Sequence, residues 1–165
     1  MPNIKEFDKD AAIQYSYKWA LSRNPAYFDF TNIGGDCTNF ISQCLYAGAK
    51  VMNPTPTYGW YYYSIYNRSP SWTSVNYLYR FLTTNKTKGP FATPIPMEEI
   101  KPGDLIQLQN NTGDFYHTLL VVEVTGPSTP EHIIINAHDI DSLRRPLITY
   151  MYTGYRCLRI EGVYV

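Results

Sequence analysis

Apolar residues recur three and four positions apart in the first half of the chain, which is the spacing of one helix face. This pattern predicts one helix over residues 8–22, which Asp8 can cap, and a second over residues 37–48, which Gly48 ends. Polar residues 71–74 offer N-cap candidates for a third helix. The first half of the chain is therefore expected to be helical.

The second half has a different pattern, in which short apolar runs alternate with turn residues. Glycine, proline and asparagine mark the turns. Four strands are predicted, over residues 105–109, 117–124, 132–138 and 155–160. Helices followed by strands favour an α+β fold. The length of 165 residues suits one hydrophobic core, so we expect a single domain over residues 1–165.

Charge narrows the classes of partner. Lysine plus arginine and aspartate plus glutamate each total 14, so the formal net charge is zero. Such a balance gives no basic surface for nucleic acid or for an anionic membrane, and we expect neither as a partner. No apolar run is long enough to span a bilayer. Residues 1–14 lack the apolar core of a secretory signal, so none is expected here.

Aromatic residues are unusually frequent, with 16 tyrosines, and several gather in residues 58–66. Tyrosine combines apolar area with a hydroxyl group, which suits the walls of a peptide-binding groove. The same properties suit a core that contains polar groups. Both interpretations of this aromatic segment remain open at the level of sequence.

The three cysteines are Cys37, Cys44 and Cys157. Cys37 and Cys44 are seven residues apart in a predicted helix, about 10 Å, which is too far for a disulfide. No cysteine or histidine spacing matches a structural zinc site. We interpret Cys44 and Cys157 as core residues and His132 as a surface residue of a hairpin.

Cys37 follows the turn Gly34-Gly35-Asp36 and opens the second predicted helix. The first N–H groups of a helix lack partners, and the helix dipole is positive there. Both effects favour a thiolate, so the pKa of Cys37 is expected to be lowered. The same N–H groups can stabilise the oxyanion of a tetrahedral intermediate, with Asn32 or Tyr27 as candidate second donors. Asp36 is expected to cap the helix.

His117 begins a predicted strand directly after a turn, and it is the candidate base for Cys37. If the strand over residues 132–138 pairs with it around a turn near residues 127–128, His117 lies opposite His138. The two-residue period of a strand then places Asn136 on the same face as His138. Either residue is a candidate for the polar group that orients His117, and direct pairing favours His138.

Simpler interpretations stand beside this one. A cysteine in a helix is often a small buried apolar residue, and a strand histidine is often structural. The same scaffold could serve a transferase, in which an amine or thiol resolves the acyl-cysteine, or a peptide-binding module without catalysis. Cys37, His117 and His138 could also hold a metal, although their separation in sequence does not specify such a site.

The segment GGDCTNFISQCL at residues 34–45 closely resembles the nucleophile motif of the putative bacterial amidase domain, a branch of the papain-like NlpC/P60 and CHAP group. Three later segments are similar to that domain as well. They are PGDLI at residues 102–106, HTLLVV at residues 117–122 and HDIDSLRRPL at residues 138–147. The resemblance covers roughly residues 10 to 150.

The resemblance implies a papain-like α+β fold in which a helix carrying Cys37 packs on an antiparallel sheet carrying His117. It implies hydrolysis of an amide in a peptide or a cell-wall peptide, through a thioester at Cys37 and without metal or cofactor. It also places a histidine at His138, with Asn136 as the alternative. Proteins of this kind are commonly secreted or located in the cell envelope, but the sequence of residues 1–14 does not support that location here.

Overall fold

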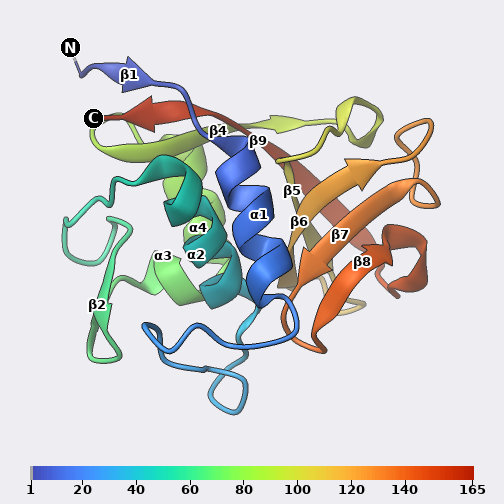
Figure 1. The fold of residues 1–165 in the computed structure, drawn as a ribbon, viewed down its shortest axis with the longest axis horizontal. Coiled ribbons are helices and arrows are strands. Elements are labelled where there is room, and N and C mark those ends of the chain that lie inside the picture. Colours follow the sequence, from blue (N-terminus) through green and yellow to red (C-terminus); the bar gives the residue numbers. More distant parts are fainter. Residues whose placement is uncertain (1) are drawn as a thin grey trace.

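The computed structural model describes residues 2–165 as helices packed on a long antiparallel sheet (Figure 1). The helices are α1 (Lys9–Trp19), α2 (Cys37–Ala49), α3 (Pro70–Thr73) and α4 (Val75–Thr84), with single-turn helices η1 (Met97–Glu99) and η2 (Leu147–Thr149). The strands are β1 (Ile4–Lys5), β2 (Tyr62–Ser64), β3 (Asn67–Arg68), β4 (Gly89–Ile95), β5 (Leu105–Gln109), β6 (Phe115–Val124), β7 (Ile133–Ala137), β8 (Ser142–Pro146) and β9 (Gly154–Tyr164).

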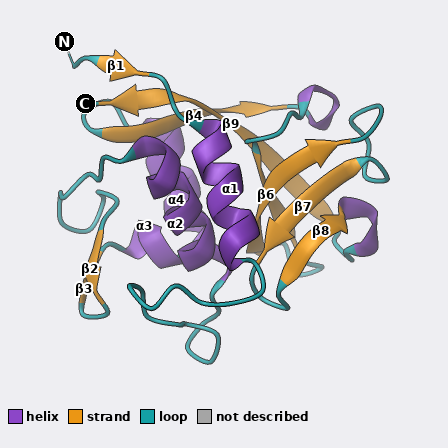
Figure 2. Ribbon diagram, in the orientation of Figure 1, coloured by secondary structure: helices purple, strands orange, loops and turns teal. Residues whose placement is uncertain are grey.

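The main sheet has seven strands in the order β1-β9-β5-β6-β7-β8, and β4 pairs with β9 beside this path. Every pairing in it is antiparallel. Figure 2 shows α1, α2 and α4 gathered on one side of this sheet. The predicted α+β class with an antiparallel sheet is therefore confirmed.

Side chains that alternate along the strands divide the core into two layers. Leu105 of β5 and Leu120 of β6 point into the layer shared with the helices. Their neighbours Ile106 and Leu119 point into a second layer on the opposite face, which Leu147 of η2 helps to close. Both faces of the central strands are thus covered, which fixes β6 rigidly in the molecule.

The expected helix starts are confirmed, but the ends of both predicted helices differ, since α1 ends at Trp19 and not at residue 22. The Asp8 carboxylate accepts a hydrogen bond of 3.0 Å from the Ala11 N–H and so caps α1. Gly48 lies inside α2, and Lys50 takes the left-handed position after the helix with a φ of 57°. Gly48 has another purpose, because a Cβ atom there would meet the Phe7 ring and the Asp8 carbonyl oxygen at 2.6 Å.

The four predicted strands are present as β5, β6, β7 and β9, within a few residues at each end. The predicted register between β6 and β7 is wrong, since Leu120 pairs with Asn136 and Val121 with Ile135. This is one residue away from the register that sets His117 opposite His138. Within the described part of the chain, no helix has the length and apolar character needed to cross a bilayer.

Candidate active site

A glycine turn delivers Cys37 to the first position of α2. Gly34 and Gly35 have φ angles of 81° and 100°, in the region that glycine adopts without steric cost. A Cβ atom on Gly35 would also meet the Asp139 Oδ2 atom at 2.9 Å. The Cys37 Sγ atom lies 3.9 Å from the carbonyl oxygen of Tyr116 in β6. The thiol is therefore held between the start of α2 and the first residues of β6.

Asp36, the residue before Cys37, is fully buried and ties this turn to its surroundings. Its Oδ1 atom accepts hydrogen bonds of 2.8 Å from the Phe30 N–H and 2.9 Å from the Asn39 side chain. Its Oδ2 atom lies 2.6 Å from Nδ1 of His138. Asp36 makes no side-chain capping bond to the α2 backbone, so the expected cap is wrong. Its carboxylate instead fixes the loop that carries the nucleophile candidate.

His117 is buried in β6, between two aromatic rings. The Tyr116 ring stacks on it with 5.9 Å between centroids, and the Tyr150 ring tilts against it at 5.5 Å. His117 and Cys37 line the same pocket, whose volume is about 300 Å³. The pocket's other lining residues are Gly34, Gly35, Tyr116, Asp139, Ile140, Arg145 and Tyr150. The two residues singled out from the sequence are therefore brought together around one small cavity.

Burial dominates the electrostatics of this pair. Desolvation and, to a smaller extent, the nearby charge of Arg145 together lower the pKa of His117 to about 4. Desolvation raises the pKa of the Cys37 thiol and exceeds the opposing effect of hydrogen bonds from Thr118 and Thr38, and the charge of Asp139 adds a smaller increase. The expectation of a lowered cysteine pKa is thus wrong, because loss of water outweighs the helix start. In the unliganded protein both groups are neutral near pH 7.

Both ring nitrogens of His138 are occupied away from His117. Nδ1 faces Asp36, and Nε2 lies 2.9 Å from the carbonyl oxygen of Trp19. The ring stacks on Phe40 of α2 with 4.0 Å between centroids. His138 is thus placed to support the turn before Cys37, and its contacts do not reach the base candidate.

Asn136, the alternative orienter, is also engaged elsewhere. Its Nδ2 atom donates to the Ser16 hydroxyl of α1 at 2.9 Å, and its Oδ1 atom accepts from the Arg144 N–H at 2.8 Å. Asn136 therefore faces the helical layer and joins α1 to β7 and β8. The one-residue shift in register explains this outcome, because it turns Asn136 toward Ser16.

Two candidate oxyanion donors lie outside the pocket. Tyr27 is partly buried and packs against Tyr62 and Trp72, at centroid distances of 5.1 and 5.9 Å. Asn32 lies in the exposed loop before the glycine turn and does not line the cavity. The backbone N–H of Cys37, at the start of α2, therefore remains the candidate donor to the oxyanion.

The other cysteines, His132 and the aromatic segment all lie outside the pocket of Cys37. Cys44 and Cys157 are buried free thiols, as predicted, and His132 caps its hairpin turn against Thr129 at 3.1 Å. In the aromatic segment, Trp60 is fully buried whereas Tyr66 is exposed, and neither lines the pocket of Cys37. Tyr61 and Tyr62 are buried with Trp60, whereas Tyr58 and Tyr63 are exposed like Tyr66. Among residues 2–165, no cluster of three His, Cys, Asp or Glu side chains is arranged to hold a metal.

Five pocket residues were not singled out from the sequence: Tyr116, Asp139, Ile140, Arg145 and Tyr150. Asp139 and Arg145 belong to the segment over residues 138–147, which resembles the closing segment of the amidase domain, but composition alone does not mark them. Asp139 accepts a 2.7 Å hydrogen bond from the Asp36 N–H, and its other oxygen is buried without a partner in residues 2–165. Only the sheet register could have placed these two beside Cys37.

The sequence was compared with known families and proteins. The model of the family described as "Putative amidase domain" matches residues 6–160. The chain belongs to this family. The amidase-family chain is also 35% identical over 144 residues to "Uncharacterized protein YhbB" of Bacillus subtilis (strain 168). The match covers 85% of this chain and 44% of the Bacillus protein, so the chain spans less than half of that relative. No solved structure matches.

Proposed function

We propose that this amidase-family chain is a papain-like cysteine hydrolase that cleaves an amide bond in a peptide or a cell-wall peptide. One observation carries the proposal: Cys37, at the first position of α2, and His117, on β6, line one pocket of about 300 Å³. Membership of the amidase family supports hydrolysis of an amide. The cysteine mechanism and the NlpC/P60-like affiliation are parts of the proposal.

In the first half of the reaction, the Cys37 sulfur attacks the substrate carbonyl carbon while the thiol proton passes to His117. Because both groups are neutral at rest, the resting site does not have to stabilise a buried ion pair. The Cys37 N–H donates to the developing oxyanion. His117 then gives its proton to the departing amine as the C–N bond breaks, which leaves a thioester on Cys37.

In the second half, a water molecule enters and His117 removes its proton as the water oxygen attacks the thioester carbon. The C–S bond breaks, the sulfur regains the proton from His117, and the carboxylic acid leaves. Each proton that His117 accepts is returned within the same half-reaction. No step requires an oxidant, a reductant or a second protein base.

His138 and Asn136 have positioning roles in this proposal. His138 acts through Asp36, whose bonds fix the turn before Cys37. Asn136 acts through Ser16 and the Arg144 backbone, which keep β7 and β8 in register beside the pocket. Neither residue is expected to touch the reacting atoms.

The test is cleavage of cell-wall peptides and of a mixed peptide pool, followed as newly formed amines. Cys37→Ala and His117→Ala should each remove turnover while leaving the circular dichroism unchanged, and Cys157→Ala serves as the matched thiol control. Peptide binding without turnover in the unmodified protein would favour a binding module instead. Transfer of the acyl group to added glycinamide, in place of hydrolysis, would favour a transferase.

A further inference from the structure

Arg145 of β8 lines the pocket of Cys37 and His117, and its side chain is held in one orientation. The guanidinium carbon lies 3.6 Å from the centroid of the Tyr150 ring. Nε donates to the Thr149 hydroxyl at 2.6 Å, and one terminal nitrogen donates to the Thr149 carbonyl oxygen at 3.0 Å. These contacts fix the cation against the pocket wall and use only part of its hydrogen-bonding capacity.

Within residues 2–165, Arg145 has no carboxylate at ion-pair distance. Its sequence neighbour Arg144 pairs with Glu123, and Arg23, in the loop after α1, pairs with Asp141. Asp139 is the acidic residue of the same pocket, but one of its oxygens is bonded to the Asp36 N–H. The pocket therefore holds a fixed cation, Arg145, and a carboxylate, Asp139, which do not form an ion pair with each other.

This charge opposes the chemistry proposed for His117. The groups that face the imidazole are Cys37 from α2, Asp139 after β7, Arg145 from β8, and the rings of Tyr116 and Tyr150. Arg145 is the cation among them, and it disfavours the imidazolium that must form when His117 accepts the thiol proton. A negatively charged substrate group bound to Arg145 would offset this charge and so favour protonation of His117.

We propose that Arg145 binds a carboxylate group of the substrate beside Cys37 and His117. This inference rests on the proposed function and names its substrate class: amides with a free carboxylate close to the scissile bond. A guanidinium recognises a carboxylate through two parallel N–H···O bonds. A volume of about 300 Å³ is at the lower end for ligand pockets, so the carboxylate belongs to a residue adjoining the cleaved bond.

Binding of a substrate carboxylate to Arg145 predicts selectivity for charged substrates in both kcat and KM. A carboxylate bound to Arg145 lowers the cost of protonating His117, so the benefit appears in kcat as well as in KM. A charge-assisted pair of this kind contributes a selectivity of roughly 10- to 100-fold over the uncharged analogue. A purely structural arginine would not distinguish the two substrates.

The first experiment follows the ring signals of His117 by NMR in a Cys37→Ala background, and it requires no turnover. N-acetylglycine and its amide are the charged and uncharged probes, and the three histidines are assigned from single His→Gln variants. N-acetylglycine should raise the pKa of His117, whereas the amide should not. Arg145→Gln should raise that pKa without any probe and abolish the response to N-acetylglycine.

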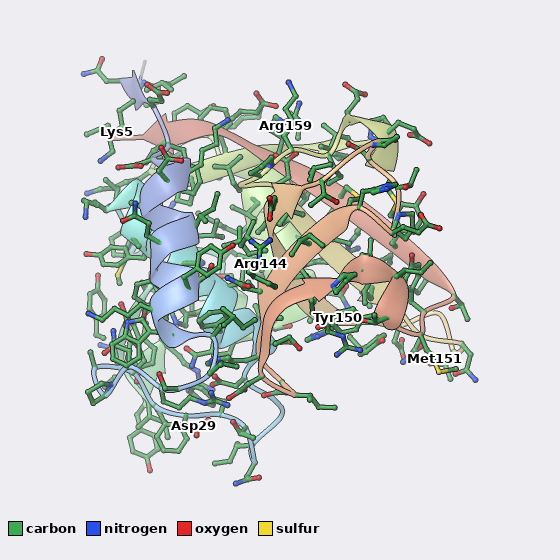
Figure 3. All side chains as sticks on the ribbon, turned by 45° about the vertical axis from the view of Figure 1, so that its right-hand side comes forward. Lys5, Asp29, Arg144, Tyr150, Met151 and Arg159 are labelled. Atoms are coloured by element: carbon green, nitrogen blue, oxygen red, sulfur yellow. The ribbon has the colours of Figure 1, made fainter. Side chains whose placement is uncertain are left out.

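Arg144→Gln is the matched control, because Arg144 contacts Tyr17 of α1 and Glu123 and does not line the pocket. In Figure 3, Arg144 lies on the side of the sheet near α1, whereas Tyr150, which contacts Arg145, lies farther from α1. This variant should behave as the parent protein does. Arg145→Lys keeps the charge without the planar fork, so it should retain the low pKa of His117 and bind the probe more weakly. It also provides the test if Arg145→Gln fails to fold.

The second experiment compares kcat and KM for one peptide with a free carboxylate and with the corresponding carboxamide. The parent protein should prefer the acid 10- to 100-fold, and Arg145→Gln should lose that preference. Equal turnover of both peptides by the parent protein would overturn the inference while leaving the proposed function intact. Absence of turnover with an intact NMR response would instead refute the proposed function. An NMR response that is unchanged by Arg145→Gln would overturn the inference directly.

Discussion

The Nδ1 atom of His138 lies 2.6 Å from the Oδ2 atom of Asp36, and both side chains are almost completely buried. This bond joins the chain just after β7 to the residue that precedes Cys37, 102 positions earlier in the sequence. Asp36 in turn orients the loop at Phe30 and the first turn of α2. The position of the thiol is therefore set by a buried polar network and not only by the helix that carries it.

His138→Ala should destabilise the fold more than Asn136→Ala does. Loss of His138 leaves the buried Asp36 carboxylate without its closest hydrogen-bond partner, which costs about 3 kcal/mol or more for a charged group. Loss of Asn136 removes two neutral hydrogen bonds and should cost about 1–3 kcal/mol. Urea unfolding of both variants measures the difference.

If turnover is found, His138→Ala should lower kcat with little change in KM, because the nucleophile and not the substrate is displaced. His138→Gln, which retains a donor toward Asp36, should recover part of the loss. A stable His138→Ala variant with full activity would contradict the positioning role of this residue.

Iodoacetamide should modify Cys37 before Cys44 and Cys157. Cys37 lines a pocket, whereas Cys44 is fully buried and Cys157 is nearly so, with a pKa raised to about 12 by burial. Because burial also raises the pKa of Cys37, its labelling should accelerate as the pH increases above neutrality. Peptide mapping by mass spectrometry gives the order, and earlier labelling of Cys157 would refute it.

His117 should make the folded protein less stable in mild acid. Its pKa is about 4 in the folded state against 6.5 for the ordinary value, so the unfolded chain binds a proton first as the pH falls. The stabilisation present above pH 6.5 is lost between 6.5 and 4, by about 3 kcal/mol in total.

The measurement is the unfolding free energy across this range for the parent protein and for His117→Gln. The variant should lose most of the pH dependence that arises from this residue. His132→Gln, at the exposed hairpin turn, is the matched control and should retain it. An unchanged slope in His117→Gln would show that the pKa of His117 is not lowered in the folded protein.

Gly35→Ala and Gly34→Ala should differ although both residues have positive φ angles. Alanine at Gly34 meets no atom within 4 Å, so it carries only a backbone cost of about 1–2 kcal/mol. Alanine at Gly35 would also press on Asp139 Oδ2 at 2.9 Å and disturb its bond to the Asp36 N–H. We expect a lower melting temperature and slower Cys37 labelling for Gly35→Ala, and equal values for the two variants would argue against this packing.

The sequence allows the helix that carries Cys37 and the strand that carries His117 to be predicted, because each follows from local patterns. Strand β4 was missed because Pro90 and Pro94 lie within it, and proline normally opposes a strand. It is tolerated here because β4 pairs with β9 alone and so forms an edge.

Long-range register was the main limit on predicting the site. A shift of one residue between β6 and β7 separates His138 from His117 and directs it to Asp36 instead. Arg145 was missed for a similar reason, since β8 is a short polar edge strand that gives no clear alternation. Its role emerges only when the strand places it beside Tyr150 and the pocket.

The central claim is that Cys37 forms the acyl-enzyme. The most direct measurement is intact-protein mass spectrometry of an acid-quenched reaction with a cleaved peptide, followed by mapping of the adduct. We expect a mass increase equal to the acyl portion of the peptide, located on Cys37, absent from Cys37→Ala and present in Cys157→Ala. Peptide cleavage that persists in Cys37→Ala, with no adduct on Cys37 in the parent protein, would contradict it.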